Sequence, residues 1–154
     1  MLRLIPAPAH RLALRIAYRL RSVWRRVVRP QTSGVCIVAI EDSGRVLLVR
    51  HSYGNRRWTL PSGGLKSGED PAETARREFA EELGCGLSDL NRVGSSVVSL
   101  MGAPDTVHLF CGKPSGAIRI DGREIVAARW FAPDALPPET SPTTRSRIAA
   151  ALEA

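Results

Sequence analysis

The chain has 154 residues and a formal net charge of +7, with 44% hydrophobic and 24% charged residues. This length fits one compact domain, and the composition excludes disordered, collagen-like and membrane-spanning classes. The three cysteines, Cys36, Cys85 and Cys111, lie far apart and form no CxxC pair, so we expect no disulfide framework and no zinc knuckle. A reducing, cytoplasmic location follows as an expectation.

The positive charge is concentrated at the start of the chain. Residues 1–30 hold eight arginines and no acidic residue, whereas residues 31–154 hold fourteen basic and fifteen acidic residues. Because the second segment is nearly neutral, we expect no general groove for a polyanion and infer no specific nucleic-acid partner. We therefore divide the chain into an arginine-rich leader, residues 1–30, and a domain, residues 31–154.

The leader is predicted to form an amphipathic helix over residues 11–29. Its apolar and arginine side chains fall on opposite faces when they are wound at about 100° per residue. Pro30 should end the helix, and Pro6 and Pro8 should keep the preceding residues extended. Arginines interrupt every apolar run, which excludes a transmembrane segment.

Three uses of this helix remain open. Its apolar face could pack on the domain or on a second subunit, giving a homodimer. Alternatively, residues 11–29 could bind an anionic membrane surface, or the leader could be an organellar transit peptide.

The domain reads as alternating strands and helices. Residues 33–41 and 45–50 are β-branched apolar runs joined by a short Asp-Ser-Gly turn, which predicts a β-hairpin. Residues 71–83 predict a helix that is capped by Asp70 and ended by Gly84. Further strands are expected at 92–100, 106–111 and 126–131, and a last helix at 143–152. This order indicates an α+β layered domain.

Three glutamates gather on the predicted central helix. Glu78, Glu81 and Glu82 stand at positions i, i+3 and i+4, so their carboxylates project from one narrow arc. Such a cluster is unfavourable without a cation, and oxygen-only ligands suit Mg²⁺ or Mn²⁺. Arg77 can pair with Glu73 and Glu81 at four-residue spacing. Ahead of the helix, a glycine-rich loop over residues 61–68 can approach phosphate or metal closely.

The segment from residue 63 to residue 85 resembles the Nudix box, GX5EX7REUXEEXGU, where U is a bulky apolar residue. The matching positions are Gly63, Glu69, Arg77, Glu78, Phe79, Glu81, Glu82 and Gly84. There are two departures: Cys85 stands at the last apolar position, and Ser62 replaces a glycine that relatives usually have. With similar flanking segments, the resemblance covers residues 33–152.

The resemblance implies a mixed β-sheet sandwiched between helices and hydrolysis of a nucleoside diphosphate linked to another moiety. Mg²⁺, or Mn²⁺, would neutralise the diphosphate and activate the attacking water. The implied metal ligands are Glu78, Glu81 and Glu82, with the backbone carbonyl of Ser62. The implied catalytic residues are Glu69 and Arg77 as supports, Glu81, and a base outside the box, for which Glu124 is the first candidate and Asp121 the second.

Other side chains are candidates for the substrate site. Arg50 and Arg57, with His51 and Arg56, could contact phosphates, and Tyr53 could stack on a base. Trp58 and Trp130 are expected in the core, and His108 is expected to be packed rather than to act as a ligand. The determinants of substrate identity are expected in loops 101–105 and 114–123. The alternative to an enzyme is a non-catalytic nucleotide-binding or membrane-surface adaptor on the same fold.

Overall fold

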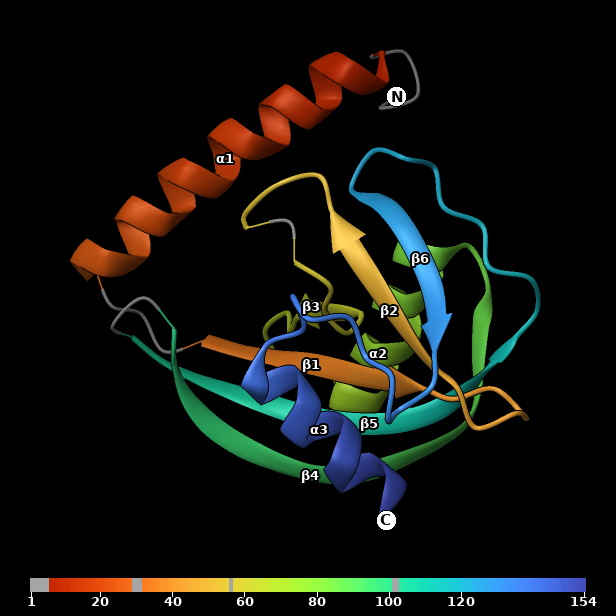
Figure 1. Ribbon diagram of the computed structural model, residues 1–154. Coiled ribbons are helices and arrows are strands. Elements are labelled where there is room, and N and C mark those ends of the chain that lie inside the picture. Colours follow the sequence, from red (N-terminus) through yellow and green to blue (C-terminus); the bar gives the residue numbers. More distant parts are fainter. Residues whose placement is uncertain (1–5, 29–31, 56, 101–102) are drawn as a thin grey trace.

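The computed structural model describes residues 6–28, 32–55, 57–100 and 103–154 (Figure 1). Three helices and six strands are formed within these residues. In chain order they are α1 (Ala7–Val28), β1 (Thr32–Ala39), β2 (Val46–His51), β3 (Ser62–Gly64), α2 (Pro71–Leu83), β4 (Gly86–Leu100), β5 (Ala103–Ser115), β6 (Ile125–Phe131) and α3 (Pro142–Leu152).

The strands form two sheets. The first has the order β3-β1-β5-β4, in which β1 runs parallel to β5, and the β1–β3 and β4–β5 pairs are antiparallel. The second contains β2 and β6, which pair antiparallel with Leu48 opposite Arg129. The predicted mixed sheet is thus confirmed, and β2 and β6 add a separate antiparallel pair.

The predicted hairpin of residues 33–41 and 45–50 is wrong beyond its turn. The backbone N–H of Glu41 donates to the carbonyl of Arg45, and Ile40 and Val46 form an isolated bridge. Beyond that point β1 pairs with β3 and β5, whereas β2 pairs with β6. The hydrogen-bonding edges of β1 are therefore taken by strands from distant parts of the sequence.

Two cores lie on opposite sides of the strands. Side chains alternate along a strand, so Val35 and Ile37 of β1 enter one core, and Cys36 and Val38 enter the other. Helix α2 closes the first core with Ala75, Phe79 and Leu83, and α3 contributes Ile148 and Ala151 to the second. Helices therefore cover both sides of the sheet, which confirms the predicted α+β layering.

Local signals set the limits of α2 as predicted. The Asp70 side chain accepts hydrogen bonds from the backbone N–H groups of Ala72 and Glu73, at 2.8 and 3.2 Å. Gly84 ends the helix in the left-handed conformation, with φ of 65°. Both ends of the helix that carries the box glutamates are thus fixed by neighbouring residues.

Parts of three predicted loops are strands instead. Residues 62–64 of the glycine-rich segment form β3, because their backbone pairs with β1, with Val35 opposite Gly63. Residues 103–105 and 114–115, expected in loops, belong to β5 and pair with β4. Met101 and Gly102 lie outside the described residues.

Helix α1 begins earlier than predicted and presents its polar side to the domain. Pro8 lies inside the first turn, where proline is tolerated because its missing N–H has no helical partner. Arg11 Nε donates to the carbonyl of Gly122 at 2.7 Å, and Arg15 Nε donates to the carbonyl of Ser52 at 3.1 Å. In Figure 1 the helix accordingly lies over the segments that follow β2 and precede β6.

Of the three alternatives for this helix, packing of its apolar face on the domain is therefore wrong, whereas packing on a second subunit stays a prediction. The large apolar side chains of one α1 face are exposed: Leu12 by 58%, Ile16 by 51%, Leu20 by 67% and Val23 by 58%. The contacts with the domain come instead from the arginine side and from the aromatic pair Tyr18–Tyr53, whose ring centroids lie 5.4 Å apart. None of the described helices is long and apolar enough to cross a membrane.

Candidate active site

Strand β3 and helix α2 meet at Gly63. A Cβ atom at this position would lie 2.0 Å from Cδ of Glu78 and 2.1 Å from its Cγ. Only a glycine leaves this space, so the first residue of the box fixes how closely the strand approaches the box helix. The Glu78 side chain lies directly over the strand as a result.

Arg77 neutralises two of the acidic side chains. Its Nε and Nη2 contact the two oxygens of Glu69 at 2.7 and 2.9 Å, and its Nη1 contacts Oε1 of Glu78 at 2.7 Å. The hydrogen bonds from Arg77 lower the pKa of Glu69 to about 2. The predicted pairing with Glu73 is wrong, since Glu73 pairs with Arg76.

Among the described residues, no basic side chain forms an ion pair with Glu82. Its side chain is buried, with the residue 8% exposed, and Oε2 has no hydrogen-bond partner. Burial raises the pKa of Glu82 well above the ordinary value, and the negative charges of Glu124 and Glu78 add to this effect. A backbone hydrogen bond from Ser62 offsets part of it. The protein therefore holds a carboxylate whose ionised form is unfavourable without a positive partner.

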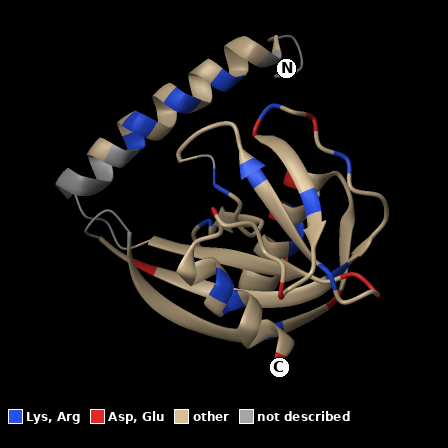
Figure 2. Ribbon diagram, in the orientation of Figure 1, with Lys and Arg blue, Asp and Glu red and all other residues tan. Residues whose placement is uncertain are grey.

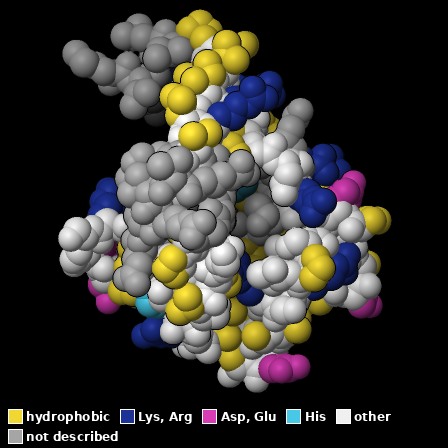
Figure 3. Space-filling model, turned by 90° about the vertical axis from the view of Figure 1, so that its left-hand side faces the viewer, with side chains coloured by type: hydrophobic (Ala, Val, Ile, Leu, Met, Phe, Trp, Pro, Cys, Tyr) yellow, Lys and Arg dark blue, Asp and Glu magenta, His cyan; other side chains and the backbone are white. Residues whose placement is uncertain are grey.

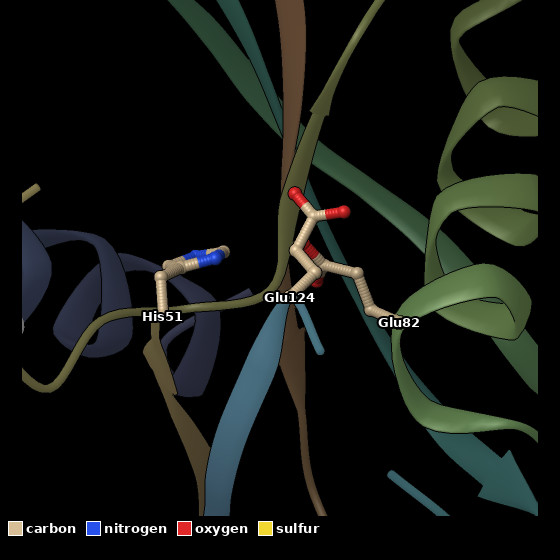
Figure 4. Close-up of side chains that lie close together, drawn as sticks. All are labelled: His51, Glu82 and Glu124. Atoms are coloured by element: carbon tan, nitrogen blue, oxygen red, sulfur yellow. The ribbon is translucent and has the colours of Figure 1, made fainter. Parts of the chain in front are cut away.

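His51 and Glu124 complete a cluster around this carboxylate (Figure 4). Among the described residues, His51, Glu82 and Glu124 form the group of three metal-ligating side chains whose ligand atoms lie within 4.8 Å of one another. His51 ends β2, Glu82 lies on α2, and Glu124 directly precedes β6. The Ser52 N–H donates to the Glu124 carbonyl at 2.8 Å, so the pairing of β2 with β6 brings the first and third residues together.

Tyr53 orients Glu124. Its hydroxyl donates to Oε1 of Glu124 at 2.7 Å, and its ring lies 5.0 Å from that of His51. Burial raises the pKa of Tyr53, as does the charge of Glu124, so the phenol keeps its proton as a donor. Burial lowers the pKa of His51, which favours the neutral imidazole, and Nδ1 of this ring has no hydrogen-bond partner.

The three box glutamates do not converge on one point. Glu78 turns toward Arg77, while the Glu81 side chain is 61% exposed, with its Oε1 3.6 Å from Arg77 Nη1. Only Glu82 faces His51 and Glu124. The pKa of Glu78 is nevertheless raised, mainly by burial and in smaller part by the negative charges of Glu81 and Glu124.

The predicted phosphate-binding arginines lie elsewhere. The Arg50 guanidinium stacks on Trp58, with Cζ 4.6 Å from the ring centroid. Arg50 and Arg57 line a cavity of about 560 Å³ together with residues 138–142. Arg50 follows the side of β2 that faces the second core, whereas His51 faces the box helix. Arg56 lies outside the described residues.

The remaining candidates separate into core and surface. Trp58 is buried in the second core, and Trp130 packs, partly buried, against the first. Asp121 is exposed and accepts a hydrogen bond from the backbone of Arg123, and it is not a member of the group formed by His51, Glu82 and Glu124. His108 is partly exposed on β5 and contacts Arg92 at 3.2 Å.

Sequence reasoning missed the position of His51 beside Glu82 and Glu124 and the hydrogen bond from Tyr53 to Glu124. The available signal was the polar run that follows a buried strand, since residues 51–53 come directly after Val49. The partner Glu124 is more than seventy residues away in the chain, so spacing alone could not join them.

The residues present fit a divalent cation. Two buried atoms, Oε2 of Glu82 and Nδ1 of His51, lack hydrogen-bond partners, and buried polar atoms are normally satisfied. Carboxylate oxygens with one imidazole nitrogen are ligands that Mg²⁺ and Mn²⁺ accept, the nitrogen being better suited to Mn²⁺. Arg77 compensates the charges of Glu69 and Glu78, and more distantly that of Glu81, but it forms no ion pair with Glu82 among the described residues.

Comparison with known proteins gives the family. The family model of the NUDIX domain matches residues 30–152. A Bacillus subtilis (strain 168) protein named as a candidate 8-oxo-dGTP diphosphatase is 30% identical over 118 residues, covering 76% of this chain and 77% of that protein. The chain therefore belongs to the Nudix family and is a Nudix-type hydrolase of phosphorus-containing acid anhydrides.

Two further similarities agree with this placement. The ADP-ribose pyrophosphatase of Mycobacterium tuberculosis (strain ATCC 25618 / H37Rv) is 47% identical over 66 residues, which cover 40% of this chain and 31% of that enzyme. The crystal structure of a MutT NUDIX hydrolase from Burkholderia pseudomallei matches with a TM-score of 0.70 and 24% identity, covering 79% of this chain and 98% of that one. This last similarity concerns the fold.

The contact between Gly63 and Glu78 yields a prediction. Gly63→Ala should displace the Glu78 side chain and weaken Mn²⁺ binding by roughly 10–100-fold, the range seen when groups that support metal ligands are lost. Gly64→Ala is the matched control, because a Cβ at Gly64 meets nothing within 4 Å. Isothermal titration with Mn²⁺ measures both; equal affinities in the two variants would contradict the role of Gly63.

Proposed function

We propose that this protein hydrolyses the diphosphate linkage of a nucleotide derivative, using Mg²⁺, or Mn²⁺, as cofactor. The observation that carries the proposal is the buried carboxylate of Glu82 on the box helix. One of its oxygens has no hydrogen-bond partner, and it lies beside His51 of β2 and Glu124, which precedes β6. A diphosphate is anionic and repels both these carboxylates and an attacking hydroxide. A cation between protein and substrate removes both obstacles.

The box residues would divide the work. Glu82 would hold the cation with the Ser62 carbonyl on β3. Glu78 and Glu81, which point toward Arg77 and toward solvent in the structure, would have to turn toward the cation to join them. When bound, the cation would neutralise the diphosphate and acidify the attacking water. Arg77 would hold Glu78 in place, since its guanidinium joins Glu69 and Glu78 in the structure.

Glu124 is proposed as the acceptor of the proton released by the attacking water. Its Oε1 accepts the hydrogen bond of Tyr53, which fixes the carboxylate and leaves Oε2 to take the proton. The carboxylate comes from outside the box and lies next to Glu82, which is the placement that a base for this reaction needs. Asp121, the second candidate, is exposed, and its carboxylate contacts the backbone N–H and the guanidinium of Arg123.

The proposed substrate class is small nucleotides. Two relatives are named for 8-oxo-dGTP and ADP-ribose; each compound joins a nucleoside to a phosphoanhydride, but the two differ in base, in sugar and in what lies beyond the anhydride. We propose that the shared portion is what this chain recognises.

The three cysteines are free in the structure, which supports a reducing, cytoplasmic setting.

Glu82→Gln tests the metal role in two ways. Hydrolysis of ADP-ribose or 8-oxo-dGTP with saturating Mg²⁺ should fall by more than about 100-fold, because the variant loses a charged metal ligand without a change of shape. Without metal, the same variant should be more stable at pH 7 by about 1 kcal/mol, or roughly 2–4 °C in Tm.

The pH dependence of this gain follows from the raised pKa of Glu82. In the folded protein the carboxyl binds its proton more tightly than in the unfolded chain, so ionisation above pH 4.5, the ordinary value, weakens the metal-free fold. The advantage of the glutamine should therefore vanish below that pH. Glu73→Gln, on an exposed part of the same helix, is the control. Full activity of Glu82→Gln, or a large loss of metal-free stability, would contradict the assignment.

We propose, second, that α1 attaches the protein to an anionic membrane surface. Its exposed stripe of Leu12, Ile16, Leu20 and Val23 points away from the domain, and the helix carries arginines and no acid (Figures 2 and 3). An apolar stripe beside cationic side chains complements acidic lipids. The polar contacts of Arg11 and Arg15 would hold the domain behind the helix.

Vesicle binding tests this attachment. The full chain should sediment with vesicles containing phosphatidylserine at low salt, and Leu20→Glu should reduce binding about tenfold by burying a charge in the lipid boundary. Leu152→Glu is the control, since Leu152 on α3 is also exposed, by 45%. Absence of vesicle binding, with a dimer that Leu20→Glu dissociates, would instead assign the stripe to a second copy of the chain.

A further inference from the structure

A cavity of about 570 Å³ lies between α1 and the segment that follows β2. It is lined on one side by Arg15, Tyr18 and Arg19 of α1 and on the other by Ser52, Tyr53 and Asn55. The helix lies outside the box and before most of the family match, which begins at residue 30. This cavity therefore exists only because the leader folds back onto the domain.

Polar and aromatic contacts fix the two walls. Arg15 Nε bonds the Ser52 carbonyl, and the rings of Tyr18 and Tyr53 lie 5.4 Å apart with planes inclined by 35°. One helical turn earlier, Arg11 bonds the Gly122 carbonyl. The polar side of α1 is thereby tied to the domain at three points along its length.

The lining has the chemistry of a site for an aromatic anion. Two guanidinium groups and two phenol rings face the cavity, and none of its lining residues is acidic. Ser52, which lines the cavity, is 1% exposed, and its buried hydroxyl has no hydrogen-bond partner, whereas buried polar groups are normally satisfied. Aromatic rings stack on nucleobases, and arginines bind phosphates.

The cavity also adjoins the metal-ligating cluster. Tyr53 forms part of its wall, and the hydroxyl of the same residue donates to Glu124 at 2.7 Å. His51, two residues before Tyr53, belongs to the cluster with Glu82. A ligand held in the cavity would therefore lie against Tyr53, the residue that contacts the carboxylate cluster.

We propose that this cavity binds the nucleoside phosphate end of the substrate, with the base against the tyrosine rings and a phosphate against Arg15 and Arg19. The inference rests on the proposed hydrolysis of a nucleotide and adds that the leader helix supplies part of the substrate site. Helix α1 would then bind two different partners, the nucleotide on its polar face and the anionic membrane surface proposed above on its apolar face.

Titration of the full chain with ADP in EDTA tests this site without turnover. The wild-type protein should bind ADP, and Tyr18→Ala and Arg19→Gln should each weaken binding roughly tenfold by removing a stacking ring or a phosphate-binding charge. Tyr18→Phe should retain binding, because it keeps the ring. Ile16→Ala, on the opposite face of the same helix, and Arg76→Gln, on α2, are the matched controls.

The outcomes separate this inference from the proposed function. With Mg²⁺, the two cavity variants should raise KM more than they lower kcat, and circular dichroism should show that α1 remains helical in them. Absence of ADP binding by the wild type, or equal affinity in Tyr18→Ala and Ile16→Ala, would overturn the site. ADP binding that depends on Tyr18, without hydrolysis of any nucleotide tested, would keep the site and refute the proposed function.

Discussion

A buried carboxylate without a cation is the constraint around which the site is built. Arg77 compensates Glu69 and Glu78, but no basic side chain pairs with Glu82 among the described residues, and its nearest charged neighbour in the cluster is Glu124. Burial of an unpaired charge is costly, and a fold keeps it only where another interaction compensates. The capped ends of α2 and the backbone hydrogen bond from Ser62 hold the carboxylate in this unfavourable place, which is intelligible if a divalent cation and its anionic substrate complete the site.

Local chemistry made α2 predictable and left the remainder of the site open. Helix α2 is capped by the residues next to its ends, Asp70 and Gly84, so the sequence alone locates both ends. The position of His51 depends on the pairing of β2 with β6 and on a shift in register between Arg50 and His51. The same shift accompanies the separation of Arg50, on Trp58, from His51, beside Glu82. Neither the pairing nor the shift leaves a periodic signal in the sequence.

The leader shows the same limit in another form. Helical periodicity separates an apolar from a basic face, but it does not say which face meets the domain. The structure shows that arginines can dock a helix by donating to backbone carbonyls, here those of Ser52 and Gly122. Both acceptors lie in loops, after β2 and before β6. The direction of a loop carbonyl depends on the loop's backbone geometry, which a pattern of residue types does not encode. The apolar face is consequently left outward, and the polar face encloses a cavity beside the site.

Anomalous diffraction from crystals soaked in MnCl₂ tests most directly whether Glu82 is the centre of the metal site. We expect a manganese peak at about 2.1–2.2 Å, near the usual distance for small divalent cations, from an oxygen of Glu82. The Glu82→Gln protein should show no peak there under the same soak. A fully occupied peak remote from Glu82, or an equal peak in the variant, would contradict the central role of this carboxylate.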